Sequence, residues 1–365
     1  MNSYVTIAII NIIALLFLSA IIRDNIILSK QRKKYFISAI GLTIIVILSE
    51  TGTVLSLGGD VSWRFFHIAC NIVGFSITPL IPIALIAIYD IQMLKKNLII
   101  LLPSALNAIM VALSPLLGLI FIVDDNNHYE RGRFFIIFVI VYTLNLLVLV
   151  LITLRVSSKF LYPIKGKIII LLVFVMTGTF IQLLLPAVYS SWHTVTLSLF
   201  LYYIILTEFD SSFDGLTGLY NRMAFQKTAK HLKKQMAFSI VAMDINDFKP
   251  INDTFGHDYG DLALKKVAEI IRDSFDDSCS CYRVGGDEFY VLCRGTDRKK
   301  LAKQLRSMTT TLAQARLSDC KLPTIAYGIS MYSGENALNL PDMLKEADEQ
   351  MYHFKHLHKE KSRTT

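Results

Sequence analysis

Two adjacent acidic residues stand at a bend between two apolar stretches, in the segment RVGGDEFYVL (283–292). The residues on either side, SCSCYRV (278–284) and FYVLCR (289–294), are typical of strands, and the Gly-Gly pair favours a tight hairpin with positive φ at its tip. An acidic hairpin tip is ordinary turn chemistry when nothing accompanies it. Another acid, however, lies at the end of the apolar strand AFSIVAMDI (237–245), and the two positions can meet in one sheet.

The three acids are Asp287 and Glu288 of the hairpin and Asp244 of the preceding strand. Carboxylates held together repel one another, so a cation between them is expected. Because the donors are oxygens, with no His or Cys nearby, they favour Mg²⁺ or Mn²⁺ over zinc. Acids that present divalent ions to a nucleotide are the usual equipment for in-line attack at phosphorus. The pattern therefore indicates phosphoryl transfer from a nucleotide.

The stretch DFKPINDTFGHDYGD (247–261) supplies further polar groups. Lys249 is suited to pairing with a phosphate. Asn252 and Asp261 are suited to reading a base edge, since a carboxylate matches the adjacent N–H donors of guanine. Taken singly, His257 is more often a structural hydrogen-bonding residue than a catalyst, and Asn252 is common in turns.

The elements that position these side chains follow the order β-α-β-β-α-β-α from about Asp214 onward. Apolar spacing predicts helices over 258–274, 297–316 and 341–357 and a further strand over 324–330. This is the order of a ferredoxin-like sheet, an α+β fold. In that topology the first strand and the central hairpin can be neighbours, which would bring the acids together.

The chain before this domain is much more apolar, and hydrophobic residues make up 53% of the whole sequence, too many for one soluble globule. Seven segments are candidates for membrane-spanning helices. They are residues 4–22, 35–57, 66–89, 98–120, 134–154, 167–187 and 190–208. We therefore expect a seven-helix all-α membrane region ahead of the α+β domain, in contact with membrane lipid.

The loop charges predict the orientation of these spans. The connections 23–34, 90–97 and 155–167 together hold 11 Lys and Arg, whereas the alternate connections hold 3. By the positive-inside rule the first set is cytoplasmic, the N-terminus is outside and the C-terminal domain is inside. The expected location is the bacterial plasma membrane, with multiple passes.

Polar residues within the predicted spans are the candidates for sensing a small-molecule signal. They are Glu50, His67, Asn71, Asn107 and Gln182. Each of them alone is more often a contact between helices. Glu50 is the exception, because a lone acid within a span is costly without a partner or a ligand.

The net charge of +8 divides into +5 for residues 1–210 and +3 for residues 211–365. Neither part has the concentrated basic face of a nucleic-acid-binding protein, so we expect no nucleic-acid partner. Four of the five cysteines fall in the part assigned to the reducing cytosol, and no disulfide is expected. Cys279 and Cys281 share one face of a strand, which indicates core packing rather than a metal pair.

Four stretches of the C-terminal half, in this order, resemble the GGDEF diguanylate cyclases. They are DGLTGLYNR (214–222), MDINDFKPINDTFGHDYGD (243–261), RVGGDEF (283–289) and ADEQMYHFK (347–355). The resemblance covers roughly residues 210–360. It implies a homodimer in which each half-site binds one GTP, and in which two GTP are joined into cyclic di-GMP with release of two pyrophosphates.

The resemblance also implies roles for individual residues. The expected ligands of two Mg²⁺ or Mn²⁺ per half-site are Asp244, the Ile245 carbonyl and Asp287. The expected catalytic residues are Glu288, which would activate the attacking 3′-hydroxyl, Asp287 and Lys249. The expected substrate-binding residues are Asn252, His257, Asp261, Lys249, Lys355 and Lys359.

The sequence departs from the family pattern at three places. Asn246 replaces a common Asp that is not a main metal ligand. Lys359 stands where a Gly-Arg pair is usual, which keeps the charge but loses a bidentate phosphate contact. The product-binding RxxD motif would fall at 276–279, and its arginine position is Asp276, so product inhibition through that site is expected to be missing.

The expected organisation is a seven-helix sensory domain over 1–208, a short linker over 209–213 and a GGDEF domain over 214–365. The seven-helix part resembles, by topology alone, the sensory regions attached to some bacterial kinases and cyclases. The alternative to an enzyme is an inactive GGDEF receptor that binds GTP or a cyclic dinucleotide and signals to a protein partner.

Overall fold

A computed structural model describes residues 2–57, 59–88, 97–158, 165–185, 188, 190–232, 237–318, 322–334 and 339–364. At the helix ends 156–158 and 357–364 it describes the backbone only. The chain divides into two compact units. The helical unit comprises residues 1–156 and 164–210, and the sheet unit comprises residues 157–163 and 211–365.

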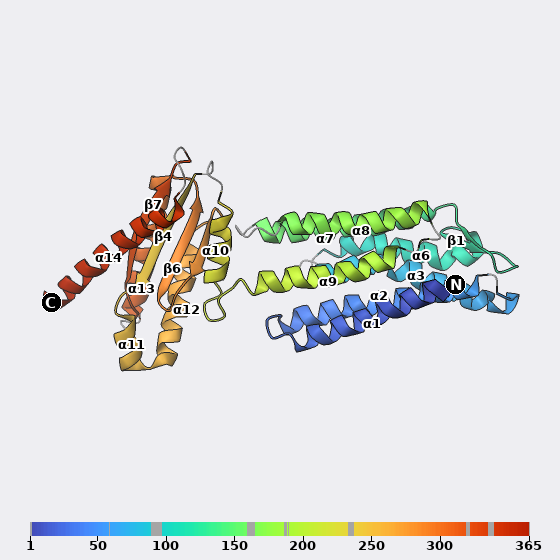
Figure 1. Ribbon diagram of the computed structural model, residues 1–365, viewed down its shortest axis with the longest axis horizontal. Coiled ribbons are helices and arrows are strands. Elements are labelled where there is room, and N and C mark those ends of the chain that lie inside the picture. Colours follow the sequence, from blue (N-terminus) through green and yellow to red (C-terminus); the bar gives the residue numbers. More distant parts are fainter. Residues whose placement is uncertain are drawn as a thin grey trace. The chain divides into compact units, whose positions relative to one another are not determined.

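The helical unit consists of helices joined by short connections (Figure 1). Its elements are α1 (Asn2–Asp24), α2 (Lys30–Ser56), η1 (Val61–Trp63), α3 (Arg64–Ile77), α4 (Leu80–Ile86), η2 (Leu98–Leu101), α6 (Leu102–Leu117), β1 (Phe121–Val123), β2 (Tyr129–Arg131), α7 (Phe135–Ser158), α8 (Lys165–Leu184) and α9 (Ser191–Asp210). Helix α2 packs against α1, α3 and α4, and α9 packs against α8 and α1. Phe36 of α2 is fully buried against the rings of Tyr202 and Tyr203 of α9.

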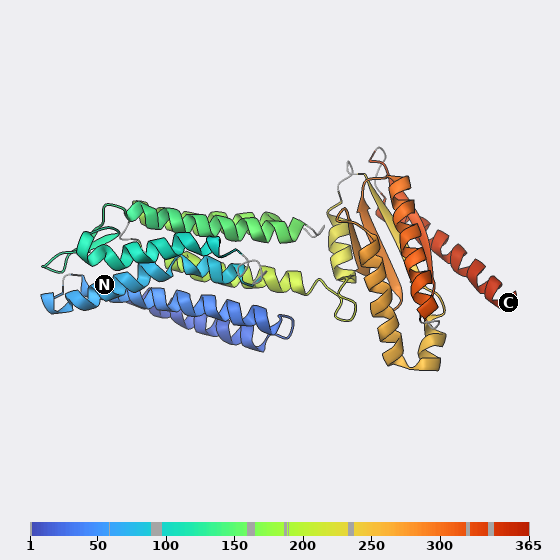
Figure 2. The same ribbon diagram turned by 180° about the vertical axis from the view of Figure 1, so that it is seen from behind.

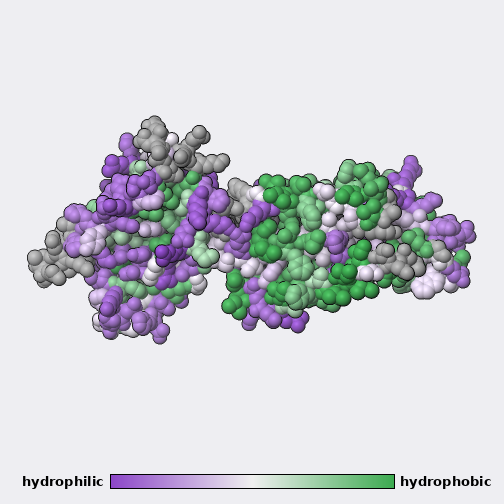
Figure 3. All heavy atoms as spheres, viewed as in Figure 1, coloured by the Kyte–Doolittle hydropathy of each residue, from purple (hydrophilic) through white to green (hydrophobic). Residues whose placement is uncertain are grey.

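Six helical stretches among the described residues are long and apolar enough to cross a membrane. They are Tyr4–Asp24, Lys30–Ser56, Val61–Ile86, Leu98–Leu117, Phe135–Arg155 and Gly166–Leu184. The predicted seventh span is a helix, α9, but it is not among the six, because Ser, Thr, Tyr and His residues are mixed with its apolar ones. Figure 3 shows hydrophobic residues gathered over the helical unit on the face in view. Of the connections used to predict orientation, residues 90–96 and 159–164 lie outside the described residues.

The third predicted span is broken into α3 and α4 at Thr78 and Pro79. Thr78 keeps helical dihedrals, but Pro79 has no N–H to donate to the Phe75 carbonyl, so the helical hydrogen-bond ladder is interrupted there. Side chains of neighbouring helices compensate the backbone there. Asn107 of α6 donates to the Phe75 carbonyl at 2.9 Å, and Asn145 of α7 donates to the Pro79 carbonyl at 2.8 Å.

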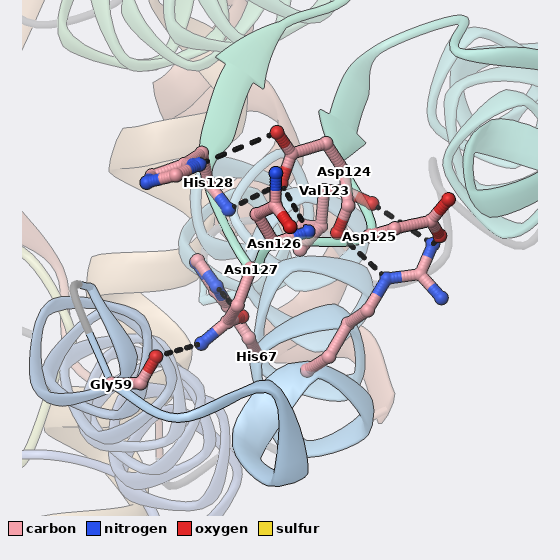
Figure 4. Close-up of polar contacts among 9 residues, drawn as sticks. Gly59, His67, Val123, Asp124, Asp125, Asn126, Asn127 and His128 are labelled. Carbon is pink, nitrogen blue, oxygen red and sulfur yellow. Dashed lines mark hydrogen bonds and ion pairs between the residues drawn. The ribbon is translucent and has the colours of Figure 1, made fainter.

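A hairpin that the sequence did not predict connects α6 to α7. Strands β1 and β2 pair antiparallel, with Phe121 opposite Arg131. Asn127 in its turn has φ of 65° and is buried. Its amide group donates to the Ser56 carbonyl at 2.9 Å. Its Oδ1 lies 2.9 Å from Nδ1 of His67 and its amide nitrogen lies 3.5 Å from the Gly59 carbonyl oxygen, the contacts of Asn127 that Figure 4 draws.

The sheet unit is an α+β domain, as predicted. Its elements are β3 (Tyr220–Asn221), α10 (Arg222–Lys230), β4 (Phe238–Ile245), α11 (Phe248–Phe255), α12 (His257–Ser274), β5 (Cys279–Arg283), β6 (Glu288–Arg294), α13 (Arg298–Ser318), β7 (Ile325–Tyr332) and α14 (Leu340–Thr364). The strand order is β3-β5-β6-β4-β7. Strand β4 pairs antiparallel with β6 and β7, so the first long strand and the hairpin strand are neighbours, as expected.

Helices cover both faces of this sheet (Figures 1 and 2). On one face, alternate residues of β4 such as Val241 and Met243 pack with Leu264 and Val267 of α12 and Leu305 of α13. Helix α14 packs on β7 and β4, and α10 packs near β5. Alternation along each strand therefore gives two apolar layers, and the polar groups are left to the strand ends.

The expectation that the cysteines remain unpaired is wrong for one pair. Cys279 of β5 and Cys293 of β6 are joined by a disulfide. The register sets them directly opposite each other on antiparallel strands, with their Cα atoms 4.0 Å apart. Cys70 and Cys281 are free, and Cys320 lies outside the described residues.

Candidate active site

The hairpin between β5 and β6 holds its acids in a fixed backbone frame. The Val284 N–H donates to the Glu288 carbonyl at 3.0 Å, which closes the turn. Neither Gly285 nor Gly286 has positive φ, so that part of the prediction is wrong. Gly285 serves a different purpose, because a Cβ there would lie 2.6 Å from Oε2 of Glu288.

Arg283 fastens the hairpin tip to the start of the domain, a role that the sequence analysis missed. Its guanidinium donates to the Gly286 carbonyl from Nε at 3.1 Å and from Nη2 at 2.8 Å. The same group donates from Nη1 to Oδ1 of Asp214 at 3.0 Å. Asp214 also accepts from the backbone and hydroxyl of Thr217, at 2.9 and 2.6 Å. Two features of the sequence could have indicated this contact: an arginine two residues before the glycines, and an acid in the stretch at 214–222 that resembles the family.

The strand register brings the predicted acids together. Asp244 of β4 lies opposite Glu288 of β6, and the N–H of Ile245 donates to the Asp287 carbonyl at 3.1 Å. Asp244 is buried, with 7% of its surface exposed, whereas Glu288 is exposed. Desolvation, followed by the charges of Asp244, Asp287 and Asp348, raises the pKa of Glu288 above its usual range. The site therefore carries an excess of negative charge.

Helix α14 brings Lys355 and Asp348 to this edge of the sheet. Nζ of Lys355 lies 2.5 Å from Oδ1 of Asp244. Asp348, two helical turns earlier on the same face, accepts a hydrogen bond from the Tyr290 hydroxyl at 3.2 Å. Burial raises the pKa of Asp348. Lys355 was predicted to bind phosphate, and Asp348 was not singled out although it lies in the resembling stretch at 347–355.

Gly328 of β7 allows α14 to approach closely enough for these contacts. A Cβ at Gly328 would lie 2.0 Å from the Ala347 carbonyl oxygen and 2.6 Å from the Met351 nitrogen. The Ser330 hydroxyl also donates to Glu346 of α14 at 2.6 Å. The position of Lys355 therefore depends on a glycine in the facing strand.

The predicted guanine-reading residues lie on the paired helices α11 and α12, which contact each other. His257 and Asp261 are exposed, and Asn252 is half-buried. Oδ1 of Asn252 is buried without a hydrogen-bond partner in the described part of the chain. A Cβ at Gly260 would lie 1.8 Å from this oxygen, so the glycine provides the space that the Asn252 side chain occupies.

The remaining predicted residues have varied surroundings. Lys249 is exposed in the first turn of α11. Lys359 belongs to α14, but its side chain lies outside the described residues. The side-chain amide of Asn246 donates to the Thr324 hydroxyl at 2.9 Å, which joins the residue after β4 to the residue before β7. Asp276 pairs with Lys300 at 2.6 Å, and this hydrogen bond lowers the pKa of Asp276 to about 2.

The donors at this edge fit a hard divalent cation by their chemistry. Asp244 and Asp287 offer carboxylate oxygens, and the ammonium of Lys355 already provides a positive charge to Asp244. Desolvation first, and then the neighbouring acids, raise the pKa of Glu288, and a cation would relieve the part that is due to the acids. No group of three or more His, Cys, Asp and Glu side chains in the described part of the chain is arranged to hold a metal. Substrate phosphate oxygens commonly complete such Mg²⁺ sites.

Comparison with known families concerns the sheet unit, which contains this site. Residues 211–361 match the family described as "Diguanylate cyclase, GGDEF domain". This part of the chain belongs to the GGDEF family, and its relatives include diguanylate cyclases.

Three relatives illustrate the extent of the similarity. Protein YhcK of Bacillus subtilis, described as uncharacterized, is 33% identical over 160 residues, which cover 40% of this chain and 44% of the relative. Diguanylate cyclase DgcS of Shewanella oneidensis is 30% identical, covering 39% of this chain and 49% of the relative. The probable diguanylate cyclase DgcT of Escherichia coli is 34% identical, covering 39% and 33%. The chain thus spans less than half the length of these relatives.

Proposed function

We propose that the protein is a membrane-bound diguanylate cyclase that condenses two GTP into cyclic di-GMP and two pyrophosphates. The observation that carries this proposal is the gathering of Asp244, Asp287 and Glu288 at one sheet edge beside Lys355. The family of residues 211–361 supports it. The signal that regulates the enzyme would be sensed in the helical unit.

Asp244, Asp287 and the Ile245 carbonyl would hold the divalent cations, Mg²⁺ or Mn²⁺. When bound, the cations stabilise the charge that develops on the reacting phosphate. Glu288 would accept the proton of the attacking 3′-hydroxyl. Its raised pKa suits that task, because a base works best when its pKa approaches the operating pH.

Other residues would bind the nucleotide. Lys249 and Lys355 would pair with phosphates, with Lys359 as a further cation at the end of α14. Asn252 and Asp261 would hydrogen-bond the guanine edge, with His257 nearby. The unpartnered Oδ1 of Asn252 supports this assignment, since a buried acceptor gains most from a ligand that donates to it.

Each active site would consist of two half-sites from two protomers, because one GTP must present its 3′-hydroxyl to the α-phosphate of the other. We propose the division into a sensory domain over 1–208, a linker over 209–213 and a GGDEF domain over 214–365. The sensory domain would lie in the bacterial plasma membrane with the N-terminus outside, and the GGDEF domain would lie in the cytoplasm. Six apolar helices support a membrane location.

The alternative is a receptor that binds GTP or a cyclic dinucleotide without turning it over. The retained acids at Asp244, Asp287 and Glu288 favour the enzyme. Asp276 in place of the RxxD arginine, already paired with Lys300, disfavours tight product binding at that position.

The deciding experiment incubates the purified full-length protein with GTP and Mg²⁺ and separates the nucleotides by chromatography. The cyclase predicts a product with the mass of cyclic di-GMP that requires the divalent cation. GTP binding with no cyclic product would contradict the enzyme and favour the receptor.

A further inference from the structure

The helical unit encloses a cavity of ≈ 470 Å³, within the size range of small-molecule sites. Its walls come from α2, α3, α7, α8 and α9 and from the β1–β2 hairpin. Aromatic and aliphatic side chains contribute equally to the apolar part of the lining, and the aromatic ones include Phe138 and Trp192. Two charged side chains, Glu50 and Arg131, also line it.

Glu50 is incompletely satisfied in this cavity. Its Oε1 accepts a hydrogen bond from Nε2 of Gln182 at 3.0 Å. Gln182 is fixed in that orientation, because its own oxygen accepts from the Ser191 N–H at 2.8 Å. Tyr4 and Trp192 lie near the same carboxylate, yet Oε2 is buried without a partner of hydrogen-bond geometry among the described residues.

Arg131 of β2 is the charge of opposite sign on the cavity wall, and the residue is also exposed to solvent. Its guanidinium carbon lies 4.9 Å from the ring centre of Phe135, a cation–π contact. The described residues provide neither Arg131 nor Glu50 with an ion-pair partner. The two groups therefore line one cavity without neutralising each other.

We propose that this cavity binds a small zwitterion with an apolar body, its ammonium group on Glu50 and its carboxylate on Arg131. Such a ligand satisfies the buried Oε2 and balances the guanidinium, while its body packs against the aromatic wall. An apolar ligand such as a lipid tail would leave the carboxylate unsatisfied, which costs free energy. A ligand with an ammonium group but no carboxylate would bring a second positive charge into the cavity and offer no negative group to Arg131.

The wall that carries Arg131 is held in place by specific contacts. The Asn127 side chain fastens the hairpin to Ser56 and His67. The ring of Tyr129, beside Arg131, lies 6.4 Å from that of His67. Arg131 is thus presented to the cavity from an ordered hairpin rather than from a free loop.

This inference deepens the proposed function by naming the class of signal, but binding itself does not require cyclase activity. The test uses Trp63→Phe protein in detergent, in which Trp192 is the one remaining tryptophan of the chain. Excitation at long wavelength then reports on the cavity alone. The probes share one body: L-phenylalanine carries both charges, phenethylamine only the ammonium and 3-phenylpropanoate only the carboxylate.

We expect a saturable change in Trp192 fluorescence with L-phenylalanine and at least tenfold weaker binding of the other two probes. Glu50→Gln and Arg131→Gln should each weaken L-phenylalanine binding at least tenfold. The matched controls Glu130→Gln and Arg133→Gln alter neighbouring charges that do not line the cavity and should leave the affinity unchanged.

Equal binding of phenethylamine and L-phenylalanine, with no effect of Arg131→Gln, would overturn the proposal. Absence of a saturable change with all three probes at millimolar concentration would overturn it as well. The comparison of probes needs no Glu50 variant, so it remains valid if that variant does not fold. Binding in a protein that makes no cyclic di-GMP would refute the proposed enzyme and leave this inference standing.

Discussion

The helical unit and the sheet unit each contain a carboxylate at a candidate ligand site, and the surroundings of the two differ. Asp244 of the sheet unit is itself buried, with Lys355 at 2.5 Å and an exposed acid, Glu288, beside it. Glu50 of the helical unit accepts a hydrogen bond from Gln182, with Tyr4 and Trp192 near the same carboxylate, and has no ion pair among the described residues. Its Oε2 atom is buried without a partner of hydrogen-bond geometry among those residues, whereas the acidic edge of the sheet includes the exposed carboxylate of Glu288. A cation from solution can therefore complete the acidic edge, whereas Oε2 of Glu50 gains most from a ligand that donates to it.

Removal of one acid from the sheet edge is expected to have the largest effect. Asp287→Ala should reduce cyclic di-GMP synthesis on the order of 10³-fold, because a ligand of the charge-stabilising cation is lost. The fold should persist, since the side chain lies at a turn. Product chromatography and circular dichroism provide the measurements. Asp277→Ala, which removes an exposed acid at the opposite end of β5, is the control, and an unchanged rate in Asp287→Ala would refute the metal assignment.

Insertions at the end of α9 test whether the orientation of this helix controls the activity of the sheet unit. Helix α9 ends at Asp210, and its last turn is tied to the bundle by ion pairs of Arg32 with Asp210 and of Lys167 with Glu208. Insertion of one to four alanines after Asp210 leaves these pairs intact. Each inserted residue rotates the downstream chain by about 100°, so activity should oscillate roughly tenfold across the series. A flat response would show that the orientation of α9 does not govern the cyclase.

Displacement of α14 should have a smaller effect. Gly328→Ala places a methyl group 2.0 Å from the Ala347 carbonyl oxygen, so the helix must move. Overpacking of this kind costs roughly 1–3 kcal/mol, and the shift of Lys355 should lower activity about tenfold. Chemical unfolding and rate measurements test this. Gly215→Ala adds the same methyl group where nothing lies within 4 Å and should be silent.

Asp214 should contribute to stability in a pH-dependent manner. Burial acts to raise its pKa, but hydrogen bonds from Thr217 and the contact with Arg283 outweigh this and hold the pKa below its usual value. The stabilisation is therefore present above about pH 4 and is lost as the pH falls through the lowered pKa. Asp214→Asn should destabilise the domain by about 1–2 kcal/mol at pH 7. The difference from the wild type should shrink toward pH 3, and a difference that does not depend on pH would contradict the assignment.

The ionised side chain of Glu288 should have the opposite effect on the free energy of unfolding. Its pKa is raised, so the ionised side chain destabilises the fold at a pH above that value. Glu288→Gln should therefore raise the melting temperature at pH 7, by about 1–2 °C because the exposed charge is screened. The increase should disappear in acid, where the wild-type side chain is protonated. A lower melting temperature at pH 7 would contradict the electrostatic description.

The sequence predicted the parts of this site that depend on strand pattern. Apolar runs bounded by turn residues placed β4, β5 and β6, and the pairing of β4 with β6 brought Asp244 to the acids of the hairpin as expected. The same reasoning missed Arg283, because its two acceptors are 69 and 3 residues away and only the folded turn brings them together. It also misjudged the two hairpin glycines: neither has positive φ, Gly285 leaves space for the Glu288 side chain, and a Cβ at Gly286 would meet nothing within 4 Å.

Prediction was less complete for the helical unit. Hydropathy located the helices, since apolar runs have one main solution in a membrane. It did not predict the β1–β2 hairpin, whose strands are three residues each, or the break at Pro79. Among the polar residues considered for sensing, Glu50, Asn71 and Gln182 line one cavity, whereas His67 and Asn107 hold backbone segments together. Residue type alone does not distinguish these roles.

The side chain of Asn127 has a consequence for motion. It joins the hairpin turn to the last residue of α2, Ser56, and to His67 of α3, so three segments far apart in sequence share one buried side chain. Figure 4 shows the contact with His67. Asn127 is buried, so water cannot take the place of its hydrogen-bond partners one at a time. The hairpin can therefore separate from α2 and α3 only if all of these contacts break together. The hairpin, the end of α2 and the start of α3 should therefore open to hydrogen exchange as one cooperative unit rather than separately.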